Sequence, residues 1–101
     1  MIKINVKKNN DKLDKITIKG HADYEEYGKD IVCSSVSSIV ITSINAIMRF
    51  DENAISYKQD EGLIEVDIKK HSREITLLLE NMISLLKELE QNYQNNIKFN
   101  E

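Results

Sequence analysis

The spacing of apolar residues changes period along this 101-residue chain, and that change limits the folds that it can adopt. Ile2, Ile4 and Val6 alternate with polar residues, which is the period-two pattern of a half-buried strand. A polar turn at 8–12 separates this strand from a second one over 13–20. Two neighbouring strands joined by a short polar turn predict an antiparallel hairpin.

Two later segments carry apolar residues at the three- and four-residue spacing of a helix. The first covers about 30–50, and Asp30 is a good N-cap residue for it. The second begins after a capping Ser72 and extends to about Gln91. Its apolar stripe consists of Ile75, Leu78, Leu79, Met82, Leu85, Leu86 and Leu89, widened by Leu77 and Ile83. A stripe wider than one buried face predicts deeper burial or a dimer contact.

The remaining apolar segments predict three more strands. Residues 54–58 and 63–69 flank the polar turn Gln59-Asp60-Glu61-Gly62 as a second hairpin, and 96–99 form a last strand. The order is β-β-α-β-β-α-β, which predicts an α+β fold with a mostly antiparallel sheet packed with two helices. A chain of this length without a linker is expected to be a single domain over 1–101.

The composition argues against several function classes. A formal net charge of −3 disfavours direct nucleic-acid binding. We find no run of about 18 consecutive apolar residues, so no membrane segment is expected. The lone cysteine cannot form an internal disulfide, which fits a reducing cytoplasm. With one cysteine and with His21 and His71 lying 50 residues apart, we expect no metal and no cofactor.

Cys33 is that lone cysteine, and it falls in the first turn of the predicted 30–50 helix. Backbone N–H groups there lack intrahelical partners and the helix dipole is positive, so a thiolate is favoured. Free amides of Cys33 and Ser34 are then candidates to bind an oxyanion. From position alone, a reactive nucleophile and an inert buried thiol are equally compatible with the sequence.

His21 directly follows Gly20 at the end of the second strand, where glycine allows the chain to turn. Residues 22–29 show no apolar period and are interpreted as a loop, which can order when a substrate binds. If this loop folds back, it brings His21 within reach of Cys33 as a general base. The alternative is a histidine that only packs the loop.

Two further residues are candidates to support this pair. Asp30 can cap the helix or orient His21, and capping is the better-founded role. Gly28 allows a positive φ before the helix. His71 lies just before the second helix and is expected to be structural.

Together these residues resemble a known family signature. The pattern consists of Gly20-His21-Ala22, Gly28, Asp30-Ile31-Val32-Cys33, two small residues and Val36-Ser37. It resembles the signature of the ribosomal-processing cysteine protease family, Prp, and the resemblance covers the whole chain in length and element order. Ser34 and Ser35 depart from the pattern, because family members often have alanine there; both residues remain small.

The resemblance implies a small α+β homodimer in the cytoplasm that acts as a cysteine endopeptidase. Its substrate would be a large-subunit ribosomal protein from which it removes a short N-terminal extension, with Cys33 as the nucleophile and His21 as the base. It identifies no substrate-binding residue. The alternative hypothesis is a non-catalytic, dimeric α+β interaction domain that assists ribosome assembly, in which the Cys–His pair has no role.

Overall fold

The observed elements follow the predicted order. The computed structural model describes residues 1–26 and 30–100. Its elements are β1 (Ile2–Asn9), β2 (Lys12–Lys19), α1 (Ile31–Phe50), β3 (Ile55–Asp60), β4 (Leu63–Ile68), α2 (Arg73–Asn92) and β5 (Ile97–Asn100). The order β-β-α-β-β-α-β and the α+β class are therefore confirmed.

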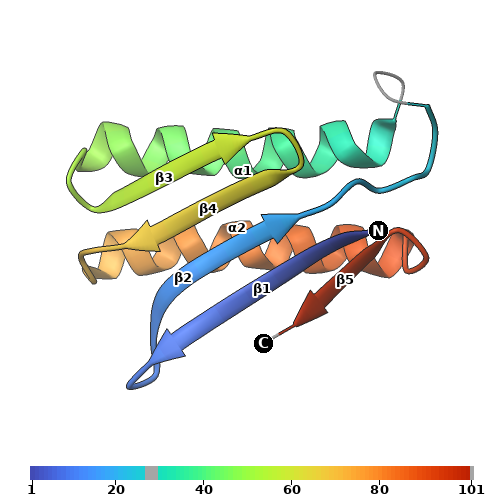
Figure 1. The fold of residues 1–101 in the computed structure, drawn as a ribbon. Helices are drawn as coiled ribbons and strands as arrows, with labels where there is room; N and C mark the ends of the chain where they lie inside the picture. The colour runs from blue at the N-terminus through green and yellow to red at the C-terminus, as the bar shows by residue number, and fades with distance from the viewer. Residues whose placement is uncertain (27–29, 101) are drawn as a thin grey trace.

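The five strands form one sheet in the order β3-β4-β2-β1-β5. The β1–β2, β2–β4 and β3–β4 pairs are antiparallel, and only β5 pairs with β1 in parallel. Figure 1 shows both helices lying on the same face of this sheet. No helix of the described residues covers the other face, which accounts for the alternation of buried and exposed residues along β1.

The core lies between the sheet and the two helices. Ile4, Ile16 and Val66 point into it from neighbouring strands and are completely buried. From α2 the core receives Ile75, Leu79, Met82, Ile83 and Leu86. Ile83 therefore belongs to the buried face, while Leu85, which we assigned to that face, is 39% exposed. The predicted and observed buried faces of α2 differ at their edges. Residues at the edge of an apolar stripe can face the core or the solvent, and only packing decides which of them is buried.

The β3–β4 hairpin has a shorter turn than the sequence suggested. Asp60 pairs with Leu63, so Gln59 and Asp60 belong to β3 and the turn is only Glu61-Gly62. The predicted four-residue turn is wrong because main-chain pairing at an edge strand does not require apolar side chains. Glu61 and Gly62 therefore form the tip of this hairpin, beside the end of β2.

By length and composition α1 could cross a membrane, with a mean hydropathy of 1.8, although the sequence showed no unbroken apolar run. Its buried residues Val32, Val36, Val40, Ile44 and Ile47 form one side that packs into the core. Ile44 is thus a core residue although it stands one step off the predicted helical pattern. An apolar side buried against a sheet is typical of the central helix of a globular domain.

Candidate functional site

His21 is held at the end of β2 by two glycines from different hairpins. Gly20 has a φ of +100°, and a Cβ there would collide with the carbonyl oxygen of Met1. Its amide donates to the carbonyl of Gly62, in the β3–β4 turn, at 2.9 Å. These contacts fit the glycine requirement at position 20, since a residue with a Cβ would meet both strain and a clash.

The imidazole of His21 rests against the tip of the β3–β4 hairpin. Gly62 has a φ of +67°, and a Cβ on it would lie only 3.1 Å from Nε2 of His21. The sequence predicts a turn at Gly62 but does not indicate that this residue belongs to the site. The only indication in the sequence was a glycine in a polar turn, and such a glycine does not reveal which side chain packs beside it.

Asp30 caps α1 and also ties down the preceding segment. One carboxylate oxygen accepts the amides of Val32 and Cys33 at 2.9 and 3.0 Å. The other accepts the amides of Tyr24 and Glu25 at 2.9 and 3.3 Å. Four bonds are about the accepting capacity of a carboxylate, so capping accounts for this side chain.

The surroundings of Asp30 keep it ionised. Its burial raises the pKa, but the backbone hydrogen bonds from Cys33, Glu25, Tyr24 and Val32 outweigh that effect and hold the pKa below its usual value. Asp30 is only 7% exposed and is the one buried charged residue among those that the structure describes. The predicted N-cap is confirmed.

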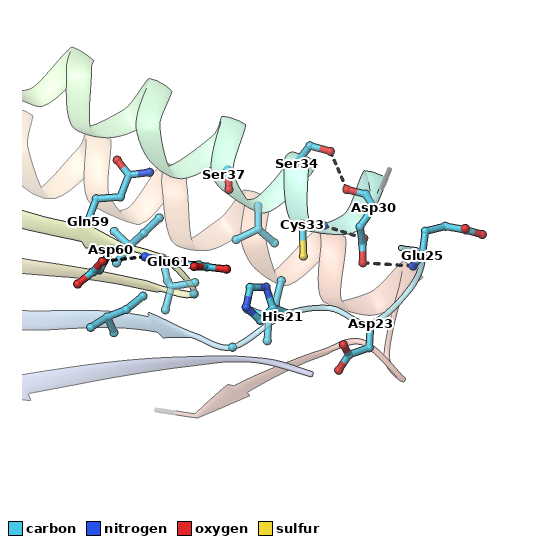
Figure 2. Close-up of a pocket in the computed structure, with 17 residues that line it drawn as sticks. His21, Asp23, Glu25, Asp30, Cys33, Ser34, Ser37, Gln59, Asp60 and Glu61 are labelled. Atoms are coloured by element: carbon cyan, nitrogen blue, oxygen red, sulfur yellow. Dashed lines mark hydrogen bonds between the residues drawn. The ribbon is translucent and has the colours of Figure 1, made fainter. Parts of the chain in front are cut away.

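The sulfur of Cys33 receives a hydrogen bond from the backbone. The amide of Ala22, the residue after His21, donates to Sγ at 3.2 Å. Figure 2 shows this sulfur pointing from the first turn of α1 toward the segment that carries His21. A backbone N–H aimed at sulfur can donate to the thiolate, which is the nucleophilic form of cysteine.

The helix start does not provide the free amides that we expected at Cys33 and Ser34. The Cys33 amide donates to the Asp30 carboxylate, and the Ser34 amide donates to the Asp30 carbonyl at 3.1 Å. The Ser34 hydroxyl donates to that same carbonyl at 2.8 Å. The predicted oxyanion site at this pair of amides is therefore wrong, because the N-cap already engages one and the helix ladder the other.

Cys33 and His21 line one groove of about 930 Å³. Figure 2 shows its walls: the start of α1, the segment after β2 and the tip of the β3–β4 hairpin. Its lining includes the exposed carboxylates of Asp23, Glu25, Asp60 and Glu61. Asp23 is paired with the N-terminal ammonium group of Met1 at 3.0 Å. None of the described lining residues is a lysine or an arginine, so the remaining carboxylates make the groove electronegative.

His71 and Tyr24 are not among the residues that line this groove. His71 Nε2 lies 2.6 Å from the Leu13 carbonyl, so it joins β2 to the start of α2, as expected of a structural histidine. Tyr24 meets the ring of Tyr93 edge-on at 5.4 Å, which packs the loop onto the end of α2. Gly28 lies outside the described residues.

A contact that the sequence did not suggest involves Asn96, which precedes β5. Its side-chain amide donates to the carbonyl of Ala22 at 2.9 Å, across 74 positions of sequence. Both backbone groups of Ala22 are thus hydrogen-bonded: its N–H donates to Cys33 and its carbonyl accepts from Asn96. No pattern in the sequence links two residues that lie so far apart.

Comparison with known proteins adds family information to this geometry. The family model described as "Cysteine protease Prp" matches residues 1–98. The chain is similar to the ribosomal processing cysteine protease Prp of Staphylococcus aureus, with 32% identity, covering 99% of this chain and 98% of that protein. The corresponding Bacillus subtilis protein is 26% identical, covering 97% and 95% of the two chains.

The fold is similar to a crystal structure of the essential S. aureus ribosomal processing protease Prp in complex with a covalently linked product peptide. The TM-score is 0.93 and the identity 31%, covering 99% of this chain and 98% of that one. A second S. aureus Prp structure, in complex with a substrate peptide, gives a TM-score of 0.87 at 29% identity, with the same coverage.

Proposed function

The chain belongs to the cysteine protease Prp family, and from that premise we propose that it is a ribosomal-processing endopeptidase. It removes the N-terminal extension of a large-subunit ribosomal protein in the cytoplasm. The observation that carries the proposal is the amide of Ala22 donating to Cys33 Sγ in the groove that also contains His21. An interaction domain without chemistry has no need of this arrangement.

The proposed reaction proceeds through an acyl-enzyme. His21 takes the thiol proton, and Cys33 Sγ attacks the scissile carbonyl carbon. The protonated imidazole then gives its proton to the leaving amine as the C–N bond breaks. A water molecule, deprotonated by His21, attacks the thioester and releases the carboxylate product and the free thiol.

Substitution of the nucleophile tests this mechanism. Cys33→Ala is expected to abolish cleavage of a peptide that spans the extension junction, and Cys33→Ser to be nearly as inactive, because a hydroxyl is a weaker nucleophile. Ser35→Ala is the matched control, since its exposed hydroxyl only donates to the Ile31 carbonyl. The measurement is mass spectrometry of the products. Cleavage by Cys33→Ala at the wild-type rate would refute the proposed mechanism.

The charge of the groove supports a basic substrate peptide. A groove lined by Glu25, Asp60 and Glu61 attracts lysine and arginine side chains, and salt screens that attraction. KM for a lysine-bearing junction peptide should rise between low and physiological salt, while an isosteric peptide with norleucine in place of lysine should show no such rise. Equal salt dependence of the two peptides would contradict this substrate class.

We further propose that the protein is a homodimer, and the support is the outer side of α2. Leu77 and Leu85 are 64% and 39% exposed, and a symmetric contact would remove both from water. Light scattering should give about twice the monomer mass of 11.7 kDa. Leu77→Glu should yield a monomer, whereas Tyr57→Glu, at an exposed residue on β3, should leave the dimer intact. A wild-type monomer at micromolar concentration would exclude the dimer.

A further inference from the structure

The segment that carries His21 is hydrogen-bonded to a residue near the C-terminal end of the chain. Asn96 lies between α2 and β5, and its side chain is half-buried. Its Nδ2 donates to the carbonyl of Ala22 at 2.9 Å. Ala22 itself is 1% exposed, so its peptide groups depend on partners within the protein.

Asn96 can act as a fixed anchor because its own backbone is tied on both sides. Its amide donates to the Tyr93 carbonyl at 2.9 Å, at the end of α2. Its carbonyl accepts the amide of Ile2 at 2.8 Å, at the start of β1. These two bonds join α2 to the sheet, and they are backbone bonds that a change of side chain would keep.

The side chain of Asn96 therefore has a separate task from its backbone. The Ala22 residue that it holds presents its N–H to Cys33 Sγ at 3.2 Å, and it adjoins His21 in the chain. The bond to the Ala22 carbonyl fixes the position of Ala22. It thereby also fixes the direction of the Ala22 N–H and the position of the neighbouring His21 imidazole. Small displacements of such groups carry a large cost in rate.

We propose that Asn96 is a positioning residue for the Cys–His pair: its amide group holds Ala22 so that the Ala22 N–H meets the sulfur of Cys33. The inference rests on the proposed function, since it assigns a role within that site. Asn96 acts through Ala22, and nothing in the structure places it in contact with the reacting atoms. Its loss should weaken thiolate stabilisation and leave the fold in place.

The test compares Asn96→Ala with Asn100→Ala. Asn100 is an exposed residue on β5 whose Nδ2 donates to Asn5 Oδ1 at 3.2 Å, so the control removes an asparagine bond close in sequence but away from the groove. The readouts are the rate of Cys33 alkylation by iodoacetamide across pH, kcat and KM on the junction peptide, and the melting temperature.

For Asn96→Ala, alkylation at pH 7 should fall by about fivefold, the usual effect of losing one hydrogen bond. The alkylation profile should move to higher pH, and kcat should fall with KM nearly unchanged. Asn100→Ala should match the wild type in alkylation and in cleavage of the junction peptide. Alkylation does not depend on turnover, so a protein that alkylates as expected but cleaves no junction peptide would contradict the proposed function and still support the positioning role.

A second pair of variants guards against a packing artefact. Asn96→Asp keeps the shape of the side chain but removes the donor, and Asn100→Asp carries the same charge change away from the groove. Asn96→Asp should lose reactivity at least as strongly as Asn96→Ala. The proposal is overturned if both Asn96 variants alkylate like their Asn100 counterparts, if only KM or the melting temperature changes, or if both fail to fold.

Discussion

Replacing Gly62 by alanine would test whether the β3–β4 turn orients the imidazole. The new Cβ would lie 3.1 Å from Nε2 of His21, whereas ordinary contacts begin at 3.4 Å. The ring must therefore move by at least 0.3 Å, the difference between these two distances. It can move because His21 is exposed on the groove side, so the expected effect is a misaligned base in an intact fold.

The displacement gives an estimate of the loss in rate. If a shift of about 1 Å costs about a hundredfold, 0.3 Å corresponds to about fourfold in kcat, or about 0.8 kcal/mol. A separate cost to stability arises because alanine disfavours a φ of +67°. That cost is about 1 kcal/mol, which lowers Tm by about 4–8 °C for a domain of this size.

The assay separates these two effects with a matched control. Asp11→Ala places alanine at a φ of +64° in the β1–β2 turn, which does not line the groove. Both variants should lose thermal stability in a calorimetric scan, but only Gly62→Ala should lose kcat on the junction peptide at a temperature where all proteins are folded. Wild-type kcat in Gly62→Ala, or the same loss in Asp11→Ala, would refute the idea that Gly62 orients His21.

Two further predictions concern stability. Asp30→Asn should be destabilised at pH 7 by about 1 kcal/mol in urea unfolding, because it replaces the oxygen that accepts the Tyr24 and Glu25 amides by an NH2 donor and leaves only a neutral acceptor at the cap. Because the folded-state pKa of Asp30 lies below its ordinary 3.8, the contribution of the charge is complete above about pH 4 and disappears as the pH falls through the lowered value. A deficit that persists unchanged at pH 2 would contradict the electrostatic argument. Ile83→Ala should lower the free energy of unfolding by about 2–5 kcal/mol in the same assay, because it opens a cavity in the core. Leu77→Ala in the dissociated monomer should lower it by less than about 0.5 kcal/mol, because Leu77 is exposed. Comparable losses in the two variants would contradict the assignment of the buried face.

Much of the fold could be predicted from local patterns. Ile2, Ile4 and Val6 are all buried, as their alternation required, and Asp30 and Ser72 cap the two helices as predicted. These features depend on neighbours within a few residues, which the sequence displays directly. The errors in the fold fell on the extent of β3 and the edge of the α2 stripe, where local propensity is nearly neutral and packing decides. The error in the site fell on the Cys33 and Ser34 amides, which the N-cap and the helix already engage.

By itself, the sequence determined the element order, the two helix caps, the placement of Cys33 in the first turn of α1 and the family resemblance. Only the tertiary structure decided that Ala22 donates to Cys33, that Gly62 faces the imidazole of His21, and that Asn96 holds Ala22. The Ala22–Cys33 contact spans 11 positions, and the Asn96–Ala22 contact spans 74. The sheet order brings the β3–β4 turn beside His21, and the parallel pairing of β5 with β1 brings Asn96 beside Ala22. Periodicity and capping act over one or two helical turns, so they carry no information about such pairs.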